Sequence, residues 1–281
     1  MKLGVVGLGA MGAGIAQLGI EAGLETIGRE LDEERGEAAR ARIAHFLTRK
    51  VEKGRLAAEA RDTALARLEV TTELADLAGC DVVIEAAFEE LGVKQELFRQ
   101  LEPVVRADAI LATNTSALSV TEIAAVLDRP ERAVGMHFFN PAPLMPLVEI
   151  VRAERTSAET FESAFALGER LGKTPIRCSD TPGFVVNRVL IPLLNDCVRV
   201  LDETGVTPED LDTGMTRGAG WPMGPCALLD LVGLDVHVHA SEALYAKLRE
   251  PRMAPPPRLV RMAQAGKLGR KTGEGFYHYR P

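Results

Sequence analysis

The chain has 281 residues, which is enough for two domains of modest size. Its hydrophobic fraction of 46% and charged fraction of 26% are typical of a folded globular protein and argue against intrinsic disorder. Only 5% of the residues are aromatic, which favours a parallel sheet with packed helices over a β-sandwich. The net charge of −7 disfavours a general nucleic-acid binder, because such proteins are usually basic.

The sequence carries no signal for a membrane, a disulfide framework or a metal site. No run approaches the roughly 18–20 apolar residues that span a bilayer, and no apolar core precedes a signal-peptide cleavage site. The cysteines are Cys80, Cys178, Cys197 and Cys226, widely separated and without a C-x-x-C pair. We therefore expect a soluble cytoplasmic protein with reduced thiols, no metal and no membrane contact.

Strands and helices alternate through the first part of the chain. Apolar strands are expected at 3–6, 26–30, 82–87, 110–113 and 133–139, and helices at 14–22, 93–105 and 120–127. The charged stretch 32–67 is expected to be a helical hairpin that turns at Gly54. This alternation predicts an α/β fold, a Rossmann-type doubly wound parallel sheet with helices on both faces.

The pattern changes near residue 180. Apolar runs at 147–151 and 174–178 flank a helical segment at 158–171, and Asp180-Thr181-Pro182-Gly183 then interrupts the alternation. Beyond it, helices are expected at 185–201, 208–213, 227–249 and 257–265. We therefore predict a Rossmann-type domain over residues 1–180 and an all-helical C-terminal domain over residues 181–281.

A glycine-rich motif follows the first strand. Gly7-Leu8-Gly9-Ala10-Met11-Gly12 matches G-x-G-x-x-G between a strand and a helix, the context that this pattern requires. The first glycine permits a tight turn, the second lets the backbone approach a pyrophosphate, and the third lets the helix pack on the sheet. Free N–H groups at the helix start then attract the phosphates. We predict that these six residues bind a dinucleotide.

A carboxylate for the ribose hydroxyls of this dinucleotide is expected about 20 residues further on. Glu30 lies eighteen residues after Gly12 and fills that position. The neighbouring Arg29 is compatible with a 2′-phosphate, but the Glu30 carboxylate would repel one. The sequence therefore favours NAD as the cofactor.

Polar residues follow three later strands. Asn114-Thr115-Ser116 follows the strand at 110–113, and His137 ends the strand at 133–139, just before Asn140-Pro141. Glu149 interrupts the next apolar run, where a buried carboxylate needs a partner, and residues 141–146 can turn the chain back so that it lies beside His137. A histidine base held by an acid is what alcohol oxidation requires, although spacing alone also allows His137 to be a hydrogen-bonded core residue.

With these motifs in hand, the sequence resembles the 3-hydroxyacyl-CoA dehydrogenases, most closely their bacterial 3-hydroxybutyryl-CoA branch. The resemblance runs nearly end to end. It includes residues 7–12, 83–86 with Glu89 and Lys94, 114–116, 137–141, 147–149, 180–188 and 269–277.

The resemblance implies a function for particular residues. His137 would be the catalytic base and Glu149 its partner, and Ser116 and Asn187 would hydrogen-bond the reacting oxygen or the thioester carbonyl. The residues implied to contact NAD are Glu30, Glu89, Lys94, Ser116 and Asn140. The implied reaction is the reversible, NAD-dependent oxidation of a short-chain (S)-3-hydroxyacyl-CoA in fatty acid metabolism, by a homodimer formed through the C-terminal helical domain.

A binding site for the CoA phosphates is expected on the helical hairpin. Arg42, Arg49 and Lys53 are spaced by seven and four residues, which puts them on one helix face. We predict that Arg49 and Lys53 bind CoA phosphates; the alternative is an ordinary solvated charged face.

Two rival functions remain open at this point. A dehydrogenase of a free hydroxy acid or sugar acid, such as an L-gulonate 3-dehydrogenase, could use the same scaffold. A non-catalytic role, like that of lens-type structural proteins, is the other alternative. The set Ser116, His137, Glu149 and Asn187 argues against it.

Overall fold

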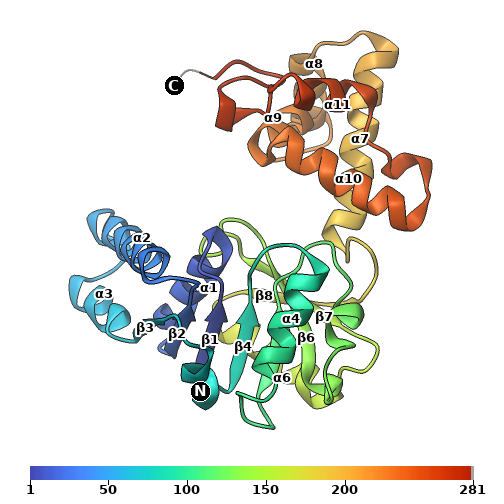
Figure 1. Cartoon of the computed structure of the whole chain (residues 1–281). Helices are drawn as coiled ribbons and strands as arrows, with labels where there is room; N and C mark the ends of the chain where they lie inside the picture. The colour runs from blue at the N-terminus through green and yellow to red at the C-terminus, as the bar shows by residue number, and fades with distance from the viewer. Residues whose placement is uncertain (280–281) are drawn as a thin grey trace. The chain divides into compact units, whose positions relative to one another are not determined.

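The computed structural model describes residues 1–279, and the chain divides between Thr181 and Pro182 into two compact units. We call them the first and the second unit; the colour ramp of Figure 1 runs from blue to yellow through the first and on to red through the second. The division lies next to the boundary expected near residue 180. None of the helices within residues 1–279 has the length and apolar character needed to cross a lipid bilayer.

The first unit is built on one eight-stranded sheet with the order β3-β2-β1-β4-β5-β6-β7-β8. The strands are β1 Lys2–Val6, β2 Glu25–Arg29, β3 Leu68–Thr71, β4 Val82–Glu85, β5 Ile110–Thr113, β6 Ala133–Phe138, β7 Leu147–Arg152 and β8 Thr174–Ser179. All neighbouring pairs are parallel except β6 and β7, which run antiparallel. The predicted α/β class is confirmed, with a sheet that is mixed and mostly parallel.

Helices cover both faces of this sheet. They are α1 Ala10–Glu21, α2 Glu33–Glu52, α3 Ala58–Leu65, α4 Leu91–Leu101, α5 Val120–Ala124 and α6 Ala158–Arg170. Side chains alternate between the faces along each strand. On β1, Leu3 and Val5 join a core that contains residues of α1, α2 and α6, whereas Val6 joins a core with residues of α4 and α5. Both faces are therefore apolar, as parallel strands require.

The predicted helical hairpin lies at the β3 edge of the sheet, where α2 contacts both α3 and β3 (Figure 1). Asp32 caps α2 by accepting a hydrogen bond of 2.8 Å from the backbone N–H of Arg35. Gly54 takes a φ of +66° in the turn, as expected for a glycine that follows a helix. The strand β3 was not predicted, because its four residues include Glu69 and directly follow a helical stretch.

The second unit consists of α7 Val186–Thr204, α8 Pro208–Thr213, α9 Pro225–Val232, α10 Leu234–Leu248 and α11 Pro257–Gln264, with short turns between them. The predicted helix at 227–249 is wrong as a single element: Gly233, with φ +100°, ends α9 and begins α10. The buried Asp230 accepts hydrogen bonds of 2.9 Å from the backbone N–H groups of Phe276 and Tyr277. This carboxylate fixes the glycine-rich tail on the helices.

Candidate active site

The glycine motif forms the turn between β1 and α1. Gly7 has a φ of +85°, in the left-handed region that favours glycine. A Cβ atom added to Gly12 would lie 1.7 Å from the carbonyl oxygen of Gly7, so no side chain fits there. An added Cβ on Gly9 meets nothing within 4 Å, so this position is open. The three glycines therefore differ in backbone conformation and in the space around them, and the functions that the motif predicts for them stay predictions.

A pocket with a volume of about 570 Å³ opens above this turn and reaches to α2 and to the segment after β4. It is lined by Val6, Gly7, Leu8, Gly9, Ala10, Met11, Arg29, Glu30, Leu31, Arg35, Ala38, Arg42, Ala86, Ala87, Phe88, Val93 and Leu97. Glu30 accepts hydrogen bonds from the N–H of Leu8 (2.7 Å) and the N–H of Leu31 (2.9 Å). These contacts hold the Glu30 carboxylate at the pocket wall.

The residues of this pocket fit NAD. The open position at Gly9 and the start of α1 suit a pyrophosphate, and the Glu30 carboxylate lines the pocket where it would accept hydrogen bonds from ribose hydroxyls. Three lining residues of α2, namely Arg35, Ala38 and Arg42, were not predicted to lie here. Their spacing of three and four residues was the available signal, because it places them on one helix face.

A buried ion pair lies beneath the strand ends. The Lys94 ammonium lies 2.8 and 3.0 Å from the two carboxylate oxygens of Glu85 and 3.3 Å from Oε2 of Glu89. Thr113 donates a hydrogen bond of 2.7 Å to Glu85, which ties β5 to β4. The Lys94 side chain is only 1% exposed. Its ammonium is thus engaged by carboxylates, and a direct contact with NAD stays a prediction.

Glu89 and Ser116 are in direct contact. One oxygen of Glu89 accepts hydrogen bonds from the hydroxyl of Thr115 (2.7 Å) and the backbone N–H groups of Ser116 (2.7 Å) and Ala117 (3.0 Å). Burial raises the pKa of Glu89, but the Lys94 charge and these hydrogen bonds outweigh it, so its pKa lies below the ordinary value. Glu89 is thereby held as a carboxylate that orders the segment of Ser116.

His137 and Glu149 face each other across the antiparallel strands β6 and β7, as the turn at 141–146 suggested. They are direct partners in the strand register, and Nδ1 of His137 lies 2.7 Å from Oε2 of Glu149. Both residues are buried, with exposed fractions of 5% and 0%. A hydrogen-bonded pair of this kind fixes the tautomer and orientation of the imidazole ring.

Glu149 has a further partner that sequence patterns do not reveal. The Cys178 thiol on β8 hydrogen-bonds the Glu149 carboxylate, and burial together with this carboxylate raises the pKa of Cys178 to about 12. The spacing of the cysteines indicates only reduced thiols. The side chain of Cys178 could be assigned to this site only once β8 was known to pair with β7.

The remaining predicted residues lie in different places. Asn140 is exposed two residues after the end of β6, and Asn187 is the second residue of α7 in the second unit. Arg49 is exposed near the end of α2, and Lys53 is the residue that caps it. The contacts expected of these four with NAD or substrate stay predictions.

The carboxyl ends of β1, β4, β5 and β6 meet at one edge of the sheet, where ligands of open α/β sheets bind. The nucleotide pocket follows β1, and His137 lies near the carboxyl end of β6, paired with Glu149 of the neighbouring β7. A Rossmann-type nucleotide site and a histidine–carboxylate pair at the same edge define a dinucleotide-dependent dehydrogenase.

Comparison with known protein families identifies the family of dehydrogenases to which the chain belongs. The family model for the NAD binding domain of 3-hydroxyacyl-CoA dehydrogenase matches residues 2–181, and the model for the C-terminal domain of the same enzymes matches residues 183–279. The chain therefore belongs to the 3-hydroxyacyl-CoA dehydrogenase family, whose members depend on NAD.

Individual relatives agree with this family. A 3-hydroxybutyryl-CoA dehydrogenase of Mycobacterium tuberculosis is 44% identical over 283 residues, covering 99% of this chain and 98% of the relative. The crystal structure of an (S)-3-hydroxybutyryl-CoA dehydrogenase from Ralstonia eutropha has a TM-score of 0.96 at 41% identity, covering 100% of this chain and 99% of that one. A more distant structure, of a 5-formyl-3-hydroxy-2-methylpyridine 4-carboxylic acid 5-dehydrogenase, has a TM-score of 0.77 at 32% identity, covering 100% and 91%.

Proposed function

We propose that the protein oxidises (S)-3-hydroxybutyryl-CoA to the 3-oxoacyl-CoA, reversibly and with NAD, in fatty acid metabolism. The observation that carries the proposal is the buried 2.7 Å contact between His137 and Glu149 at the sheet edge that holds the nucleotide pocket. The short acyl chain is supported by the names of relatives that are 40–44% identical, among them those of Mycobacterium tuberculosis and Clostridioides difficile.

The chemistry of the pair follows from its geometry. Glu149 occupies Nδ1 of His137, so Nε2 is the nitrogen that accepts the proton of the substrate hydroxyl. The imidazolium formed in this way stays next to the Glu149 carboxylate, which stabilises its charge. Bound NAD would accept the hydride that leaves the carbon bearing this hydroxyl. In the reverse direction His137 returns the proton to the oxygen.

Other side chains position the substrate. In this proposal Ser116 and Asn187 hydrogen-bond the reacting oxygen or the thioester carbonyl, and Glu89 holds the Ser116 segment in place. Asn140, Glu89 and Lys94 contribute to NAD binding, Lys94 through the two carboxylates that surround its ammonium.

A comparison of substrates tests the proposed reaction. We expect kcat/KM with NAD to be highest for the C4 3-hydroxyacyl-CoA, lower for the C8 and C16 esters, and at least about a hundredfold lower for free 3-hydroxybutyrate and L-gulonate, because the free acids lack the CoA contacts. A preference for a free acid would favour a dehydrogenase of free hydroxy acids or sugar acids. The comparison is informative because a structural relative at 32% identity is named for a free pyridine carboxylic acid.

The CoA site is tested on α2. Arg49 and Lys53 continue the face whose Arg42 lines the nucleotide pocket, and both are exposed. The double variant R49E/K53E should raise the KM for the CoA ester by about tenfold or more and leave the KM for the N-acetylcysteamine thioester unchanged, because only CoA carries phosphates. Arg40, exposed on the opposite side of α2, offers the control R40E. Equal effects on both substrates would mean that the face is simply solvated.

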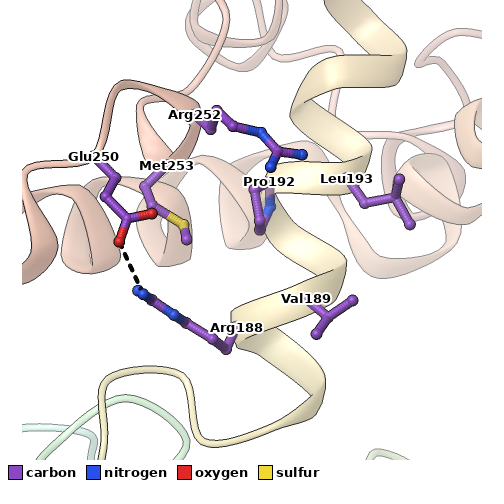
Figure 2. A pocket seen from close by; sticks show the side chains of 7 residues that line it. All are labelled: Arg188, Val189, Pro192, Leu193, Glu250, Arg252 and Met253. Carbon is purple, nitrogen blue, oxygen red and sulfur yellow. Dashed lines mark hydrogen bonds and ion pairs between the residues drawn. The ribbon is translucent and has the colours of Figure 1, made fainter.

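We also propose that the protein is a cytoplasmic homodimer that assembles through the second unit. The helix α7 exposes Val189 (62%; Figure 2) and Val200 (39%), which are eleven residues apart and therefore share a face. The four cysteines are free thiols, in keeping with a reducing compartment. Light scattering should give twice the chain mass of 30.3 kDa, and V189E/V200E should give the monomer mass.

A further inference from the structure

Lys173 is a buried lysine that hydrogen-bonds main-chain carbonyl oxygens. It directly precedes β8 and is only 9% exposed. Its ammonium donates a hydrogen bond of 2.6 Å to the carbonyl of Ala142 and one of 2.9 Å to the carbonyl of Met145. Burial lowers the pKa of Lys173, because the ammonium is partly removed from water there.

Both carbonyls belong to the segment 140–146, which joins β6 to β7 and begins with Asn140. The segment is also fixed at other points. A Cβ added to Gly14 of α1 would lie 2.9 Å from Pro143 and 3.1 Å from Ala142, so the segment packs directly on the helix that follows the glycine motif. At its far end, the carbonyl of Pro146 accepts a hydrogen bond of 2.7 Å from the N–H of Thr174.

The segment therefore links the functional parts of the site. It starts three residues after His137 and ends three residues before Glu149, and its middle rests against α1. His137 and Glu149 are register partners within the ladder of β6 and β7, so strand pairing itself holds these two residues. Asn140 lies beyond that ladder, so its position depends on how the segment is held.

We propose that Lys173 is a positioning residue, whose ammonium fixes the segment 140–146 and thereby places Asn140 for NAD binding and hydride transfer. The inference rests on the proposed function, because it takes Asn140 to contact NAD. Lys173 acts through Asn140 and does not itself touch the reacting atoms.

The test compares Lys173→Met with a matched control at the opposite end of β6. The control is Arg132→Met: Arg132 is 5% exposed and also donates to carbonyl oxygens, those of Arg106 (2.9 Å) and Glu102 (3.3 Å). We expect K173M to lower kcat/KM for NAD by about 10- to 100-fold, since small displacements of positioned groups have effects of this size. R132M should change it less than about threefold even if both variants lose thermal stability alike.

Three further measurements separate positioning from folding. The Kd for NADH should rise in K173M and not in R132M, and hydrogen exchange should accelerate in the peptide 141–146 only in K173M. Lys173→Arg, which keeps the charge and two donors, should restore kcat/KM to within about threefold of the wild type.

The coupling to Asn140 decides the inference. If Lys173 acts through Asn140, N140A/K173M should be no worse than N140A alone by more than about threefold, because the second change removes nothing further. The inference would be overturned if the losses of kcat/KM in N140A and K173M multiplied in the double variant. It would also be overturned if K173M matched R132M in kcat/KM, NADH affinity and hydrogen exchange. A wild type inactive on 3-hydroxybutyryl-CoA would contradict the proposed function instead, while NADH affinity and exchange would still test Lys173.

Discussion

At the scale of single residues, the contact between His137 and Glu149 predicts that their substitutions are not additive. Glu149→Gln keeps the shape of the side chain but removes its charge, so kcat should fall by about two to four orders of magnitude. His137→Gln should give a similar loss, and the double variant should be little worse than either single one, because the two residues act as a unit. Steady-state kinetics of the three variants provides the measurement.

The affinity for NAD is the control for this experiment. It should barely change in any of the three variants, because Gly7, Gly9 and Glu30 form the nucleotide pocket separately from the pair. Losses that multiply in the double variant would show that His137 and Glu149 work independently.

Glu30 carries the prediction about cofactor choice. Its carboxylate is held by the N–H groups of Leu8 and Leu31 at the pocket wall, so it would meet a 2′-phosphate with repulsion. The difference should amount to about 2–3 kcal/mol, roughly a hundredfold in Kd in favour of NAD over NADP. Glu30→Gln should narrow that ratio. Calorimetric titration with both cofactors measures it, and equal dissociation constants in the wild type would refute the argument.

At the scale of elements, two glycines in the turn between β1 and α1 should respond differently to substitution: Gly12 in protein stability and Gly9 in NAD binding. Gly12→Ala would force a Cβ to within 1.7 Å of the Gly7 carbonyl oxygen, so α1 must shift and the stability should fall by about 1–3 kcal/mol or more. Gly9→Ala meets no atom within 4 Å and should leave the melting temperature unchanged.

The same Gly9→Ala should nonetheless raise the Kd for NAD by about tenfold, because the new methyl group stands where the pyrophosphate must approach. Thermal melts and NAD titrations of both variants check the distinction. A Gly9→Ala variant with unchanged NAD affinity would mean that the pyrophosphate does not lie over this turn.

The elements also show how far sequence patterns reach. Apolar runs and the glycine motif were enough to predict the sheet class, the α2–α3 hairpin and the turn that brings Glu149 beside His137. The strand β3 and the break at Gly233 were missed. A strand of four polar and apolar residues and a single glycine are weak local signals, and tertiary packing decides the structure that such segments adopt. Contacts such as that of Cys178 with Glu149 depend on the order of strands in the sheet, which periodicity does not encode.

At the scale of the whole molecule, a buried histidine in the second unit links stability to pH. His237 is 4% exposed, and its Nε2 lies 2.9 Å from Oδ1 of Asn195. Burial lowers the pKa of His237 from 6.5 to about 4. Because the folded-state pKa is depressed, the stabilisation is fully present above pH 6.5 and is lost as the pH falls towards 4, by up to about 3 kcal/mol.

Thermal unfolding between pH 7 and 4.5 measures this effect. His237→Gln removes the titrating group, so its melting temperature should fall less steeply with decreasing pH than that of the wild type. His45→Gln, at an exposed position of α2, is the matched control. An unchanged slope in the His237 variant would assign the acid sensitivity to other groups.

The antiparallel pairing of β6 and β7 has a consequence for how such enzymes diversify. The proposed base His137 and the carboxylate of Glu149 are twelve residues apart on adjoining strands, so both are encoded in one short stretch of gene. Recombination with crossovers outside that stretch keeps the two residues in the same gene, whether or not the stretch is exchanged. The second unit and the α2–α3 hairpin can then be exchanged or drift in sequence, altering which molecules are recognised, while the apparatus for proton transfer is inherited intact.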